Sequence, residues 1–159
     1  MKLARIAIAC LILVISSCIA VADTNLLSIS LDTNEWNIGS VPVGGVVDTW
    51  FNSNGTFCVS NSGTVAAKIM ISVTNSTPDG WVAGLDVGTN RFCMSYALDA
   101  GSGLAPNYLP VSTNDVVMTN GFATNETFRF DLQFRAPSGG GPTNVEQTIK
   151  VTISAMSAE

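Results

Sequence analysis

The sequence contains no histidine, and only 12% of its residues are charged. Histidine is the commonest general base and a frequent metal ligand, so its absence excludes His-dependent catalytic triads and histidine metal sites. The few charges are mainly acidic, with a formal net charge of −5. Nucleic acids and anionic membrane surfaces are bound through clusters of Lys and Arg, so this composition argues against both as partners.

The first 22 residues have the organisation of a secretory signal peptide. Lys2 and Arg5 form a basic start, residues 6–15 are an apolar run, and Ala20-Val21-Ala22 is a small-residue cleavage site. The apolar run is shorter than the roughly 20 residues that span a bilayer. We therefore expect a signal peptide at 1–22 and one domain at 23–159.

A second processing route remains open in the same region. Ile15-Ser16-Ser17-Cys18 resembles the lipobox of bacterial lipoproteins, in which the cysteine is acylated. In that alternative the protein is a lipoprotein anchored at Cys18, and otherwise it is secreted to the cell surface or periplasm. The signal or this anchor is the membrane contact that the sequence predicts.

The segment Thr127–Pro137 alternates apolar and polar residues without interruption, as a half-buried strand requires. The alternation predicts one face toward a core and one toward water. The expected inward residues are Phe128, Phe130, Leu132 and Phe134, and the expected outward residues are Arg129, Asp131, Gln133 and Arg135.

Similar patterns, separated by Gly-, Pro- and Asn-rich turns, predict about seven to nine short strands. The clearest lie at 26–31, 46–51, 56–61, 67–74, 91–98 and 147–155. We expect 56–61 and 67–74 to form a hairpin, and the last two strands, 127–137 and 147–155, to pair. The pattern is typical of a two-sheet antiparallel β-sandwich, with a closed barrel as the alternative.

Several of these segments resemble a known kind of module. The run Phe57–Ala67, followed by Asn75-Ser76-Thr77-Pro78 and Trp81, is similar to the V-x-N-x-G hairpin of bacterial and archaeal secreted immunoglobulin-like modules. The segments 127–137 and 147–155 are similar to their F-x-L-x-F-x-A-P and T-I-x-V-T-I-x-A strands. The resemblance implies an immunoglobulin-like sandwich of envelope and extracellular-fibre proteins, and it carries over no catalytic residue.

Cys58 and Cys93 are the cysteines that remain after signal cleavage, and an even pair in an oxidising compartment predicts a disulfide. Two reduced thiols are the alternative. Both cysteines fall on the face opposite their apolar neighbours, so a bridge requires neighbouring strands that share an outer face.

Two sets of residues are candidates for ligand binding. Rings near breaks in the strand pattern could stack on sugars, and these are Trp36, Trp50, Trp81 and Tyr108. Acidic loop residues could bind calcium, although Asp in such loops is usually a turn former, and these are Asp79, Asp86, Asp99 and Asp115. No cofactor is expected.

Together these patterns favour a non-enzymatic structural or interaction protein of the cell envelope or extracellular matrix. The strand Leu26–Leu31 begins close to the processed N-terminus, so it could complete the sheet of a neighbouring copy, as in donor-strand polymers. Pairing of this strand in its own sheet is the alternative. The expected partners are the protein itself or other envelope components, and the alternative function is an envelope-polysaccharide or carbohydrate-binding module.

Overall fold

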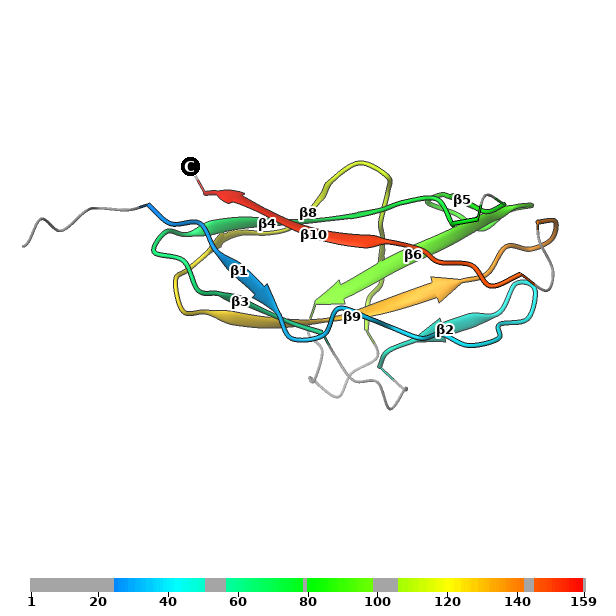
Figure 1. Ribbon diagram of the computed structural model, residues 1–159, viewed down its shortest axis with the longest axis horizontal. Helices are drawn as coiled ribbons and strands as arrows, with labels where there is room; N and C mark the ends of the chain where they lie inside the picture. Colours follow the sequence, from blue (N-terminus) through cyan, green and yellow to red (C-terminus); the bar gives the residue numbers. More distant parts are fainter. Residues whose placement is uncertain (1–24, 51–56, 79, 99–105, 142–144, 159) are drawn as a thin grey trace, which may run out of the picture.

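The computed structural model describes residues 25–50, 57–78, 80–98, 106–141 and 145–158. Within these ranges the chain forms ten β-strands in two sheets and no helix, so the predicted all-β fold is confirmed (Figure 1). The strands are β1 Ile29–Leu31, β2 Val46–Asp48, β3 Phe57–Asn61, β4 Ala67–Val73, β5 Val82–Ala83, β6 Arg91–Leu98, β7 Leu109–Pro110, β8 Val116–Phe122, β9 Thr127–Arg135 and β10 Val151–Ser157. The expected signal peptide and Cys18 lie outside the described residues.

The two sheets differ in size. The larger has seven strands in the order β1-β3-β9-β6-β5, with β2 also beside β9 and β7 also beside β6. The smaller has three strands in the order β10-β4-β8. The pairings between these strands are antiparallel, except that β5 and β6 are parallel. This arrangement of two layers is consistent with a β-sandwich.

Strand β9 occupies the centre of the larger sheet and has the predicted inward face. Phe130, Leu132 and Phe134 are buried, and the ring of Phe130 stacks on Phe57 with centroids 5.3 Å apart. Phe128 meets Phe122 of β8 edge-on at 5.1 Å, which joins the two sheets. Each buried side chain of this size stabilises the fold by roughly 1.5–3 kcal/mol, so β9 supplies a large part of the core.

The outward face of β9 differs from the prediction at one residue. Arg129 and Arg135 are exposed as expected, but Asp131 is fully buried. Its carboxylate accepts a hydrogen bond from the hydroxyl of Thr49, which follows β2 and is itself buried. The expectation that this face meets water throughout is therefore corrected, because the chain after β2 covers its middle.

The two predicted strand pairings are also corrected. Strands β3 and β4 lie in different sheets, since β3 pairs with β1 and β9 whereas β4 pairs with β10 and β8. The same holds for the last two strands, β9 and β10. Alternating apolar residues are required both in strands that pair and in strands that face each other across a core, so the pattern does not distinguish them.

The crossing from β3 to β4 is stabilised by the buried side chain of Asn61. Its amide Nδ2 donates to the carbonyls of Val65 and Phe122, each at 3.0 Å. Its Oδ1 accepts from the backbone N–H of Gly63, also at 3.0 Å. Asn61 therefore links the larger sheet to the connection and to β8 of the smaller sheet.

We predict that Asn61→Ala destabilises the fold by about 3 kcal/mol, because it removes three hydrogen bonds of a buried side chain, two of them to the carbonyls of Val65 and Phe122. Urea unfolding of the chain 23–159 measures the change. Ser60→Ala, on the opposite face of the same strand, is the matched control and should change the free energy of unfolding by less than about 1 kcal/mol. Equal losses for the two variants would contradict this role of Asn61.

Candidate functional site

A groove opens between the two sheets along the side where β10 forms the edge of the smaller sheet. Its volume is about 970 Å³. One wall is the inward face of the larger sheet, with Phe57, Phe130, Leu132 and Phe134, and the other is formed by Ile149, Val151 and Ile153. Residues 33–43, between β1 and β2, also line it. The walls are therefore mostly the apolar interior of the sandwich.

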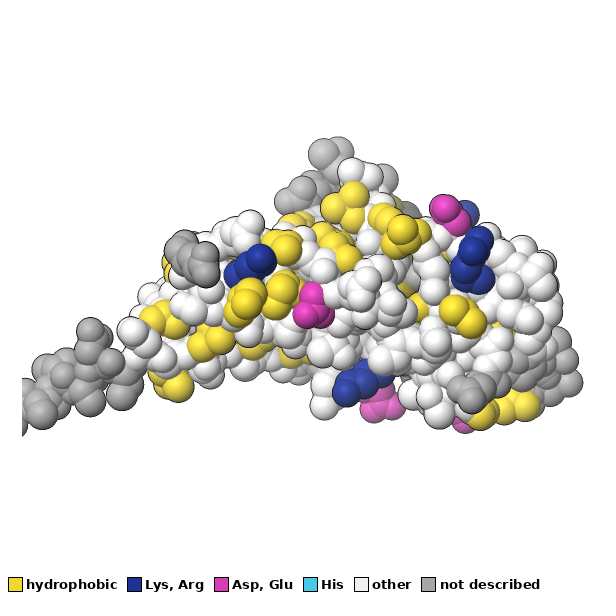
Figure 2. Space-filling view, turned by 90° about the horizontal axis from the view of Figure 1, so that it is seen from above, with side chains coloured by type: hydrophobic (Ala, Val, Ile, Leu, Met, Phe, Trp, Pro, Cys, Tyr) yellow, Lys and Arg dark blue, Asp and Glu magenta, His cyan; other side chains and the backbone are white. Residues whose placement is uncertain are grey.

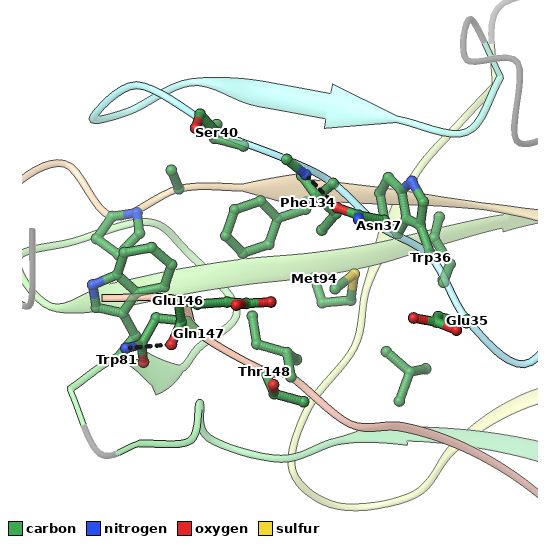
Figure 3. Close-up of a pocket in the computed structure, with 18 of the residues that line it drawn as sticks. Glu35, Trp36, Asn37, Ser40, Trp81, Met94, Phe134, Glu146, Gln147 and Thr148 are labelled. Carbon is green, nitrogen blue, oxygen red and sulfur yellow. Dashed lines mark hydrogen bonds between the residues drawn. The ribbon is translucent and has the colours of Figure 1, made fainter. Parts of the chain in front are cut away.

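Polar side chains project into this groove from two segments. Figure 3 shows Glu35, Asn37 and Ser40 from the chain before β2, and Glu146, Gln147 and Thr148 from the chain before β10. Such a combination of apolar walls and a few polar groups is typical of binding sites in proteins.

Two of these polar groups are held in place by hydrogen bonds. The hydroxyl of Ser76 donates to Gln147 Oε1 at 2.6 Å, and the same hydroxyl accepts from the N–H of Trp81 at 3.0 Å. Asn37 Oδ1 accepts from the N–H of Gly39 at 3.0 Å. The positions of Gln147 and Asn37 are therefore fixed by the folded chain.

Trp36 and Trp81, two of the four predicted sugar-stacking rings, line the groove together (Figure 3). Trp81 packs nearly parallel to Phe134, with ring centroids 6.2 Å apart. Gly141 lies against the indole Nε1 of Trp81 with a φ of +80°, where a larger residue would be strained and would collide with the ring. Both tryptophans are half-buried, so only part of each ring surface faces the groove.

The other two candidate rings, Trp50 and Tyr108, do not line the groove. Tyr108 precedes β7, and the negative charges of Asp48 and Asp131 act on its hydroxyl. Two of the predicted rings thus line one groove, at opposite ends of it (Figure 3), and the other two lie elsewhere. Spacing in the sequence could not show this, because the pair depends on how the chain before β2 crosses the sheet.

Two of the four acidic residues proposed for calcium binding lie in the described part of the chain, and they belong to no metal-binding group there. Asp86 and Asp115 are exposed in separate loops, and Asp79 and Asp99 lie outside the described residues. The backbone carbonyl of Asp86 accepts a hydrogen bond from Nε of Arg91 at 2.9 Å. Across the described part of the chain, no group of three or more Cys, Asp or Glu side chains is arranged to hold a metal ion.

The structure corrects the predicted disulfide, because the thiols of Cys58 and Cys93 are both free. Strand β9 separates their strands, and the two cysteines lie opposite Arg129 and Arg135, six residues apart along β9. That offset is about 20 Å along a strand and about 10 Å across it. A disulfide needs Cα atoms roughly 4.4–6.8 Å apart. The shared outer face was predicted, but the strands are not neighbours.

Comparisons with known proteins found no match for the chain among family models, curated proteins or solved structures. In the described ranges there is no helix that is both long and apolar enough to cross a membrane.

The buried surroundings of Tyr108 give the protein a pH dependence at alkaline pH. Burial raises the pKa of Tyr108, and the charges of Asp48 and Asp131 raise it further. Burial also raises the pKa of Tyr96. As the pH rises past about 10, the unfolded chain loses these protons before the folded chain does. The stabilisation is therefore complete below that pH and is lost as the pH rises through the folded-state pKa.

We predict that Tyr108→Phe weakens this fall in stability between about pH 9 and 11, because one tyrosine that titrates differently in the two states is removed. Urea unfolding at a series of pH values measures the free energy of unfolding for the wild type and the variant. Their difference should be constant near neutral pH and should change above about pH 10. Parallel pH profiles up to pH 11 would contradict the raised pKa of Tyr108.

Proposed function

We propose that this chain is a non-enzymatic structural or interaction protein of the cell envelope or extracellular matrix. It is exported by the signal at 1–22, or anchored at Cys18, and folds as an immunoglobulin-like module over residues 23–159. The groove beside β10 is its interaction site. The observation that carries this proposal is the open edge of β10 next to an apolar groove, because these features suit the capture of another polypeptide.

The position of β1 bears on how such a protein would assemble. In the isolated chain β1 pairs with β3 of its own sheet, from Ile29 opposite Asn61 to Leu31 opposite Val59. The N–H groups of Ser62 and Gly63 both donate to the carbonyl of Ser28. These bonds favour the alternative in which the N-terminal strand stays in its own sheet, so the contact that we propose with other subunits is at β10 instead.

A carbohydrate-binding module is the second candidate function. It is favoured by one observation, the presence of Trp36 and Trp81 in the same groove as Glu35, Asn37 and Gln147. Indole rings stack on the apolar faces of sugars, while carboxylates and amides hydrogen-bond their hydroxyls. For this second candidate function, the proposed ligand is a polysaccharide of the envelope.

We predict that the purified chain 23–159 forms oligomers or fibres in a concentration-dependent manner, as seen by light scattering and electron microscopy. Reductant is the control and should change nothing, because both thiols are free. A monomer at all concentrations, together with a tryptophan emission spectrum that shifts on adding envelope glycans, would replace this function with the carbohydrate-binding one. A monomer with an unresponsive spectrum would contradict both.

A further inference from the structure

Within the described residues, the backbone of β10 is hydrogen-bonded along one edge, the edge toward β4. The backbone N–H and C=O groups of its even-numbered residues point toward β4. At the two ends of the strand, the carbonyl of Lys150 accepts from the N–H of Thr74, and the N–H of Ala158 donates to the carbonyl of Ala66. In an antiparallel ladder the residues between them point their N–H and C=O groups the other way. Val151, Ile153 and Ala155 therefore present these groups at the open edge, and no described segment pairs with it.

The burial of the side chains on β10 also indicates that this edge is open. Val73, Ile71 and Ile69 of β4 are almost completely buried. Their register partners on the same face of β10, Val151, Ile153 and Ala155, are only half-buried. Because the two strands are adjacent in one sheet, the difference comes from the missing neighbour on the far side of β10.

The remaining strand edges in the described part of the chain are all protected. β1, β2, β5 and β7 have two or three residues each, and β7 contains Pro110. The other edge of the smaller sheet, β8, has an irregular register against β4. Short strands, proline and bulges are the usual means of preventing edge pairing. β10 has none of them, since it pairs with β4 over seven consecutive residues in regular register.

The edge of β10 is also uncharged. Residues 151–157 contain no charged side chain and no proline. Figure 2, which looks onto the molecule from above the smaller sheet of Figure 1, shows few charged side chains on this face. No charge on β10 itself would therefore repel a neutral strand laid beside it.

Building on the proposed function, we propose that the partner of this edge is β10 of a second copy, paired antiparallel across a two-fold axis. A register centred on Ile153 sets Ile153 opposite its own counterpart and Val151 of each copy opposite Ala155 of the other. The open N–H and C=O groups then bond to one another, and the two three-stranded sheets become one continuous sheet.

A second copy of β10 suits this edge because the side chains that face each other in the register are compatible, which need not hold for an unrelated strand. Each inward pair in the register is apolar, and the outward pair of Thr152 with Ser154 is neutral, so no like charges meet. Val151 and Ile153 already form part of one wall of the groove. The same residues of the second copy would extend that wall across the mouth of the groove.

The test uses a proline placed where the backbone N–H faces the open edge. Ala155→Pro removes a donor that β4 does not use, whereas Ser154→Pro removes one that it does. We expect light scattering to give twice the chain mass for the wild type and the single-chain mass for Ala155→Pro, with a similar urea midpoint. Ser154→Pro, the matched control, should lose much of its stability. If Ala155→Pro fails to fold, Ala155→Lys blocks the edge by charge alone.

The register is tested by cross-linking. Oxidised Ile153→Cys should form a covalent dimer that the wild type, with its native cysteines, does not form. Association that survives both Ala155 variants would overturn this inference while leaving the proposed function intact. Association without the Ile153→Cys cross-link would overturn the two-fold register. A wild-type monomer at all concentrations would overturn both the inference and the self-assembling form of the function.

Discussion

The backbone hydrogen bonds of β9 are the constraint on which the larger sheet depends. β9 pairs with β6 along one edge and with β2 and β3 along the other. This fixes Phe130, Leu132 and Phe134 over the core, and so it also fixes one wall of the groove. The separation of Cys58 from Cys93 follows from the same arrangement, because β9 stands between their strands.

The long strands of the smaller sheet are not all hydrogen-bonded along both edges by described residues. Its middle strand, β4, is bonded on both edges, whereas β10 has a partner on one edge among the residues that the structure describes. Unpaired backbone N–H and C=O groups are costly when buried, which is why the open edge of β10 faces solvent. Such an edge, with half-buried apolar residues along it, indicates a place for a further strand. The groove and the edge thus have one physical origin, which is a three-stranded sheet packed on a larger one.

The sequence allowed the inward and outward faces of β9 to be predicted, because a two-residue period depends only on local backbone geometry. It did not allow strand pairing to be predicted, as β3 and β4 show. The alternation in each strand requires a core but does not say whether its neighbour in the sequence lies beside it or across from it. The error over the disulfide had the same cause.

The candidate site was predictable in its residue types but not in its grouping. Aromatic residues near breaks in the pattern were recognised, yet only Trp36 and Trp81 share the groove. Glu146, Gln147 and Thr148 were not recognised, because polar residues before a strand carry no distinguishing signal in a sequence rich in turns. The alternation in the sequence predicts that Asp131 faces solvent. Its burial in the structure depends on Thr49, which is distant in the sequence.

In the single chain, β10 has one hydrogen-bonded edge and one edge that no described segment covers. Residue-resolved hydrogen exchange tests this arrangement most directly, at a concentration where light scattering reports a monomer. We expect slow exchange for the amides of Thr152 and Ser154, which point toward β4, and fast exchange for those of Val151, Ile153 and Ala155. Slow exchange at all five amides would contradict it, since the edge would then already be covered by the chain's own residues.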